Sequence, residues 1–118
     1  MQAHEASVLH ILAHALLEND QPAKAAVLLE ALDALRPSEP CTLLALATAQ
    51  LRSGSPPAAL QTLARLAPHA HAWPAAHLVK AQALSTLGQA DAAMASMQQF
   101  LATRTRTTSQ DHENERTL

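Results

Sequence analysis

The chain of 118 residues contains very few of the residues that build β-sheets, disulfides or phosphate-binding loops. Strands favour aromatic side chains and the β-branched Val and Ile, which are scarce here, so the composition predicts no β-sheet. A lone cysteine excludes an internal disulfide and a zinc site built on a cysteine cluster, and two glycines do not make a glycine-rich phosphate loop. The rare residues are Trp73, Phe100, Val8, Val27, Val79, Ile11, Cys41, Gly54 and Gly88.

Charge of either sign is also sparse. Eight basic and ten acidic residues give a net charge of −2 at pH 7, with no basic stripe for nucleic acid and no polybasic anchor for anionic lipid. The first twenty residues lack a positively charged start, and His10 and His14 interrupt their apolar run. They predict a first helix, not a signal peptide or a membrane span, and we expect a cytoplasmic protein without direct membrane insertion.

What the chain has is alanine and leucine in a regular order. Ala13, Ala47 and Ala81 are spaced 34 residues apart, and Ala25, Ala59 and Ala93 repeat that interval. Alanine and leucine favour helices, so the spacing predicts an all-α fold of three helix-turn-helix units at about 6–39, 40–73 and 74–104. The first helices are predicted at 7–18, 41–52 and 75–87, and the second helices at 22–35, 57–66 and 91–102.

The turns inside the units have suitable residues. Gly54 and Gly88 provide left-handed stops, and Ser or Asp before proline offers an N-cap and a preset first turn. Corresponding positions are apolar in the first two units, whereas His77 and Lys80 replace leucine in the third, which we therefore expect to be the least regular. The aligned sets are Leu9, Leu43 and His77; Leu12, Leu46 and Lys80; Leu29, Leu63 and Met97; and Leu32, Leu66 and Phe100.

This pattern resembles the tetratricopeptide repeat over about residues 6–104. The resemblance implies a short right-handed superhelix whose inner groove is lined by the first helix of each unit and accepts a partner helix or an extended segment. Several groove leucines would equally serve packing within the stack. The implied partner-binding residues are His10, His14, Leu17, Cys41, Leu44, Thr48, Leu51, Leu78, Gln82 and Ser85.

The histidines and the cysteine are the candidates for chemistry. His10 and His14 are four residues apart, a spacing suited to metal ligands, and His69 with His71 precede Trp73. No third ligand accompanies the first pair, and Cys41 has no evident base, so we expect no metal, no cofactor and no enzyme, with Cys41 a buried structural thiol. Residues 105–118 are polar up to Leu118 and predict a disordered tail after a 1–104 domain.

Within the repeat family, the chain is similar to the type III secretion chaperones of the SctY (YscY) class. The similarity lies in its size, in residues 26–40 and 78–102, and in the polar end with His112, Glu113 and Asn114. It implies a bacterial chaperone that binds a small secreted SctX-like protein as a heterodimer and brings it to the export gate SctV, so that the chain meets the inner membrane only through the export apparatus. The alternatives are a chaperone of the needle subunit and a generic scaffold that homodimerises through its last repeat.

Overall fold

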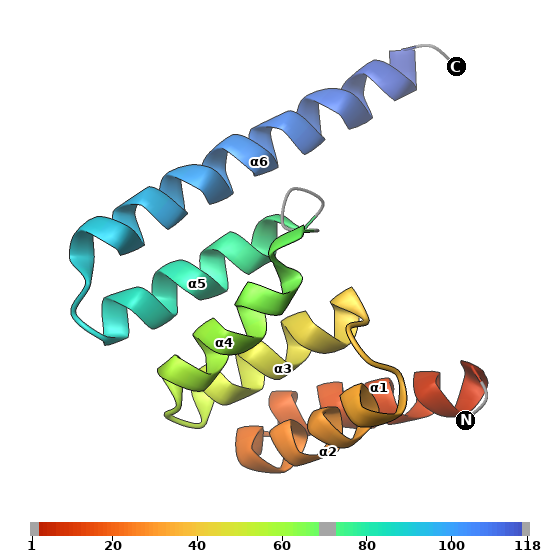
Figure 1. Cartoon of the computed structure of the whole chain (residues 1–118). Helices are drawn as coiled ribbons and strands as arrows, with labels where there is room; N and C mark the ends of the chain where they lie inside the picture. The colour runs from red at the N-terminus through yellow and green to blue at the C-terminus, as the bar shows by residue number, and fades with distance from the viewer. Residues whose placement is uncertain (1–2, 69–72, 117–118) are drawn as a thin grey trace.

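The computed structural model describes the backbone of residues 3–68 and 73–116, and side chains within residues 8–68 and 73–104. These ranges contain six α-helices and no strand, so the all-α prediction is confirmed (Figure 1). The helices are α1 (Ala3–Glu18), α2 (Pro22–Leu35), α3 (Pro40–Arg52), α4 (Pro56–Leu66), α5 (Pro74–Thr86) and α6 (Ala90–Arg116).

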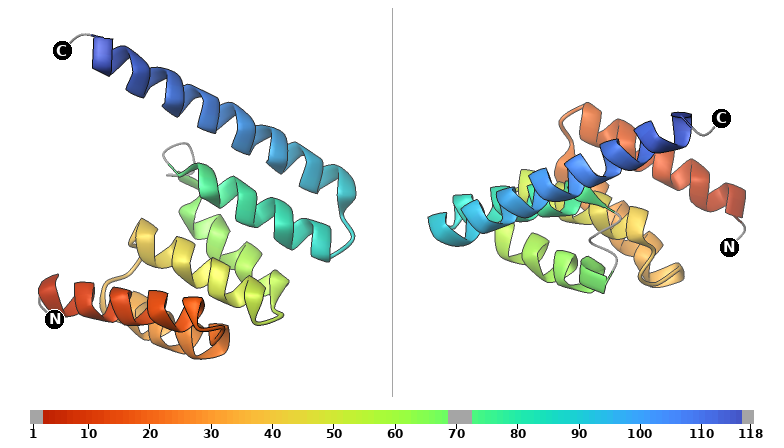
Figure 2. Two further views of the ribbon diagram at one scale, coloured as in Figure 1. Left: turned by 180° about the vertical axis from the view of Figure 1, so that it is seen from behind. Right: turned by 90° about the horizontal axis from the view of Figure 1, so that it is seen from above.

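The helices form three antiparallel hairpins that are stacked in chain order, with α1 and α6 at opposite ends (Figures 1 and 2). Each helix packs on its neighbour in sequence, and α3 also contacts α1, as α5 contacts α3. The predicted tandem units are therefore confirmed, and the first helices α1, α3 and α5 lie next to one another along one side of the stack. No helix in the described part of the chain is long and apolar enough to cross a membrane.

Proline starts four of the helices. Pro22, Pro40, Pro56 and Pro74 occupy the first turn of α2 to α5, where the fixed φ of proline favours the helix and its missing N–H is not needed. The side-chain caps predicted for the second helices α2 and α4 are wrong, since no preceding side chain makes a capping hydrogen bond there. The starts of α3 and α5 have no such bond either. Each helix starts without that bond because proline already sets its first turn.

The turn within each unit repeats the same backbone geometry. Asp20, Gly54 and Gly88, spaced 34 residues apart, have φ values of 60°, 89° and 80°. The amide N–H one residue after each donates to a carbonyl five residues back, for example from Ser55 to Gln50 at 2.9 Å. This left-handed stop reverses the chain in every unit, which confirms the role predicted for the two glycines and adds Asp20 to it.

The core is made of alanine and leucine, as predicted. The repeat alanines of α1, α3 and α5 are buried, as are those of α2 and α4, and their small side chains let the helices approach closely. Leu29 and Leu66 are fully enclosed, and the buried residues form two clusters along the stack. At roughly 25 cal/mol per Å² of buried apolar area, these clusters stabilise the fold.

The third unit departs from the other two, as predicted. In α6, Ala93, Met97 and Phe100 are only half-buried, whereas Ser96 and Thr103 are buried. His77 on α5 is half-buried, so burial, together with the nearby charge of Lys80, lowers its pKa. Lys80 itself is exposed, so its side chain is solvated, which is why α5 tolerates it at a leucine position.

The structure corrects three predictions. Leu12, expected in the core, is 49% exposed because no described segment covers that face of α1. The first helix begins at Ala3 instead of residue 7. The predicted disordered tail after residue 104 is wrong, since α6 continues to Arg116. No proline or glycine follows Gly88, so nothing interrupts helix propagation from the packed first half of α6.

Candidate partner-binding groove

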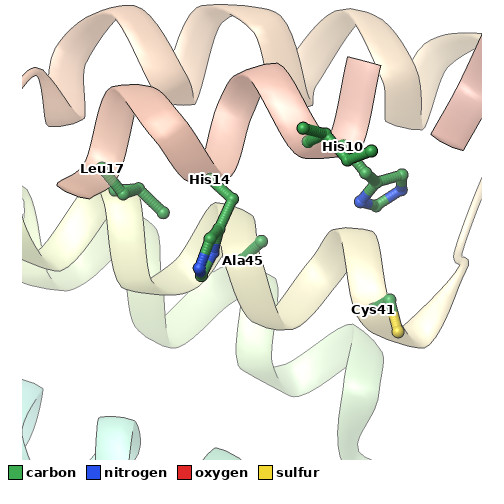
Figure 3. Close-up of a pocket in the computed structure, with 6 residues that line it drawn as sticks. His10, His14, Leu17, Cys41 and Ala45 are labelled. Atoms are coloured by element: carbon green, nitrogen blue, oxygen red, sulfur yellow. The ribbon is translucent and has the colours of Figure 1, made fainter. Parts of the chain in front are cut away.

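A hollow of about 370 Å³ lies between α1 and α3. Its lining residues come from one face of α1 and from the start of α3, and Figure 3 draws them and labels five. Those five and Ile11 make up the lining. They are His10, Ile11, His14, Leu17, Cys41 and Ala45.

A second hollow of about 310 Å³ continues the first toward α5. The two share His14, Leu17, Cys41 and Ala45, so together they form one groove, called here the α1–α3 groove. The second hollow adds apolar surface from Leu44 and Trp73, and polar groups at its end. Its further lining residues are Glu18, Leu44, Thr48, Arg52 and Trp73.

The two histidines of the groove are held differently. His10 is half-buried, and its Nε2 lies 2.9 Å from Oγ1 of the buried Thr42 on α3. This hydrogen bond ties α1 to α3 and fixes the position of the His10 ring. His14 is exposed, and its Nε2 lies 3.1 Å from Glu18 Oε1, one helical turn away. Such an exposed pair contributes little to stability, so His14 is free to rotate toward a guest.

The floor of the groove is apolar. Leu17 is buried and belongs to the first core cluster, yet its side chain lines both hollows. Leu44 is half-buried and packs against the second cluster while lining the groove. Packing within the stack and contact with a guest are therefore not exclusive for these two leucines. Cys41 is exposed in the groove, so the prediction of a buried thiol is wrong. It stands at the first turn of α3, where no later helix covers it.

Three of the expected groove residues from the third unit do not join this groove. Gln82 and Ser85 line a separate hollow of about 500 Å³ between α5 and α6. Leu51 packs against the second core cluster, and Leu78 is half-buried on α5. The structure thus brings together His10, His14, Leu17, Cys41, Leu44 and Thr48, and places the other four predicted residues elsewhere.

The sequence prediction missed several residues of the α1–α3 groove. Trp73 comes directly before α5 and lines the groove. Its signal in the sequence was its rarity, since it is the single tryptophan of the chain. The other lining residues that were not predicted are Ile11, Glu18, Ala45 and Arg52.

The described side chains offer no evident metal centre. Within residues 8–68 and 73–104, no group of three or more His, Cys, Asp and Glu side chains is arranged to hold a metal ion. His69 and His71, the second histidine pair of the sequence, lie outside the described residues. His10 is instead engaged with Thr42, and His14 with Glu18.

Stacked helical hairpins with a groove along their first helices define a helical repeat protein, a class that uses such concave surfaces to bind other proteins. Comparison with known families agrees with this class. Residues 16–83 match a tetratricopeptide repeat model, and residues 74–99 match a second model of the same repeat. The chain therefore belongs to the tetratricopeptide repeat family, whose members are typically non-catalytic scaffolds for protein–protein interaction. No curated protein matches the chain.

Proposed function

We propose that this chain is a non-catalytic chaperone that binds one helix of a small secreted protein in the α1–α3 groove. The observation that carries the proposal is the groove itself, an apolar floor next to a polar edge on a repeat scaffold. The similarity of residues 26–40 and 78–102 to the SctY class supports an SctX-like cargo and delivery to the export gate SctV in the bacterial cytoplasm. The proposal assigns no cofactor to the groove.

The chemistry of the groove defines the guest. Leu17, Leu44, Ala45 and Trp73 offer apolar contacts to a helix that carries Leu, Ile or Val at positions i, i+3, i+4 and i+7. Each Å² of apolar surface that the guest buries contributes about 25 cal/mol, from which the cost of association is subtracted. Covering that stripe also keeps an amphipathic cargo from aggregating before export, which is the task of a secretion chaperone.

The polar end of the groove sets the orientation of the guest. Glu18 and Arg52 line the same hollow, and Arg52 Nη2 lies 3.7 Å from Asp20 Oδ1, with the Asp20 side chain 93% exposed. This ion pair is weak at such exposure, so a guest carboxylate can take its place on Arg52. We therefore expect a guest helix with an acidic residue beside its apolar stripe at the Arg52 end.

The test uses Trp73 as a built-in probe, because it is the single tryptophan and lines the groove. Titration with a tryptophan-free SctX-like protein is expected to shift the Trp73 emission to shorter wavelength in a saturable manner. Cys41→Arg places a long charged side chain in the groove and is expected to weaken this binding at least about tenfold. Cys41→Ser retains the small side chain and should bind as the unmodified chain does.

The controls separate the groove from the cargo. Ala34→Arg adds the same charge at an exposed position of α2 away from the groove, so its binding should be unchanged. If the needle subunit binds in the groove and the SctX-like protein does not, the cargo assignment is wrong and the runner-up function holds. If Cys41→Arg binds cargo as tightly as Cys41→Ser, the groove is not the site.

A further inference from the structure

The three units pack on one another at two junctions, and at each junction the first helix of one unit covers an apolar face of the unit before it. At the first junction, α3 presents Leu46 and Ala49 to the cluster formed with α1 and α2. At the second, α5 presents Ala76 and Val79 to the cluster formed with α3 and α4. In both cases the first helix of a unit packs on the unit before it. One of these positions recurs after 34 residues, since Ala45 packs against the first cluster and Val79 belongs to the second.

The same positions on α1 are uncovered. Leu12 corresponds to Leu46 of α3, Val8 to Ala76 of α5, and Ile11 to Ala45 and Val79, all of which pack at these junctions. Lys80, the α5 equivalent of Leu12, is exposed. Leu12 is 49% exposed, whereas the equivalent Leu46 is 3% exposed, and Val8 is 60% exposed, whereas the equivalent Ala76 is 6% exposed. We name Val8, Ile11 and Leu12 the head face. It is a junction surface without a described segment upon it.

The other half of a junction is uncovered at the opposite end of the stack. Ala93, Met94 and Met97 on α6 correspond to Ala25, Ala26 and Leu29 on α2. The α2 residues are all buried, whereas Met94 is 63% exposed and Met97 is half-buried. Together with Gln82, Ser85 and neighbouring residues of α5, these side chains line the hollow of about 500 Å³ between α5 and α6. We name Ala93, Met94 and Met97 the tail face.

We propose that the head face of one copy packs on the tail face of a second copy, so that the chain associates head to tail. The internal junctions indicate which partner fits the tail face. The equivalent faces of α2 and α4 are covered by α3 and α5, and these are the helices equivalent to α1. Figure 1 shows α1 and α6 at opposite ends of the stack, so one molecule does not close this contact on itself. The methionines of the tail face adapt to the bulkier side chains of the head face.

The contact is heterologous, and this property makes it testable. After two copies pair, one copy still has a free head face and the other a free tail face. Further copies can therefore add as the concentration rises, and association does not stop at a dimer. A symmetric dimer through the last unit would stop at two copies. The contact shares Ile11 with the lining of the α1–α3 groove but uses neither Cys41 nor Trp73. Leu12 and Met94 do not line that groove, so substitutions at these two residues test the contact separately from the proposed cargo binding.

The experiment blocks one face at a time. Leu12→Glu disables the head face and Met94→Glu disables the tail face, both at exposed positions where folding is retained and is checked by circular dichroism. Sedimentation velocity of the unmodified full chain is expected to show a mass that rises with concentration. Each variant alone is expected to remain monomeric, since a buried unpaired carboxylate should weaken the contact at least about tenfold.

A mixture of the two variants gives the decisive result. The intact tail of Leu12→Glu fits the intact head of Met94→Glu, so the mixture is expected to form a 1:1 dimer and nothing larger. Val27→Glu is the matched control, because Val27 is exposed and its equivalents Gln61 and Ala95 are exposed as well. It should associate as the unmodified chain does. A monomeric unmodified chain, variants that associate normally, or a mixture that stays monomeric or exceeds a dimer would each overturn the proposal.

Discussion

Truncating one repeat position in all three units tests the packing of the stack. Leu29, Leu63 and Met97 are equivalent by the 34-residue period, but Leu29 and Leu63 are buried whereas Met97 is half-buried. Replacing each with alanine removes a comparable number of side-chain atoms. The cost in the free energy of unfolding should therefore follow burial and not sequence position.

The magnitudes follow from the structure. Leu29 has no exposed surface and belongs to the first cluster, so Leu29→Ala leaves a cavity and is expected to cost about 3 kcal/mol, within the usual range of roughly 2–5 kcal/mol. Leu63→Ala is expected to cost about 2–3 kcal/mol, because its cluster has an equivalent core. Met97 already contacts solvent in its hollow, so Met97→Ala is expected to cost no more than about 1 kcal/mol.

Urea unfolding followed by circular dichroism measures these costs, at protein concentrations low enough to keep the chain monomeric. Trp73 fluorescence reports the middle of the stack in the same samples, because repeat stacks can unfold in parts. Coincident transitions allow the three free energies to be compared directly. A Met97→Ala cost equal to that of Leu29→Ala would refute the reasoning, since it would require a third unit packed as tightly as the first.

Two further predictions concern the ion pair between Asp33 and Arg65, which joins the first two units, and the turn at Gly54. Arg65 donates to both carboxylate oxygens of Asp33, at 2.7 and 2.9 Å, and this lowers the pKa of Asp33 below its ordinary value of 3.8 against the opposing effect of burial. The ion pair therefore stabilises the fold above pH 3.8, and this stabilisation is lost as the pH falls through the lower pKa of the folded state. In urea unfolding, Asp33→Asn should lower the free energy of unfolding by about 1 kcal/mol at pH 7 and by much less near pH 2. An equal cost at both pH values would contradict this prediction. Gly54→Ala should lower the free energy of unfolding by about 1 kcal/mol, because alanine is strained at the φ of 89°. A steric clash does not contribute, since no atom lies within 4 Å of the added Cβ. An unchanged melting temperature would contradict the left-handed turn geometry at this residue.

Much of the fold was predictable because its causes are local. Proline at the first turn and a left-handed residue after the last turn act within a few residues, so helix limits such as Pro22–Leu35 agree with the prediction. The repeat alanines identify the close contacts of the first two units correctly. The continuation of α6 to Arg116 was missed because the polar composition of its end was weighed above the absence of helix breakers.

The candidate site was less predictable, since a groove depends on which helix lies beside which. His10, Leu17 and Thr48, which the repeat alignment selected, line the groove because they share one face of the first helices. The alignment did not anticipate that Gln82 and Ser85 would line a different hollow, because that depends on how α6 lies against α5. It also did not reveal Trp73, which lies directly before α5 and outside the predicted first helices.

The amino-acid sequence by itself determined the helical repeat, its 34-residue period and its turns, because propensity and turn geometry are properties of neighbouring residues. Only the tertiary structure decided which copies of a repeated position are buried. Leu12 and Leu46 occupy equivalent positions, yet one is exposed and the other enclosed, because a preceding unit covers α3 and none is described upon α1. Exposure is a property of the whole stack, and the surfaces that bind a guest or a second copy arise where the stack leaves a repeated position uncovered.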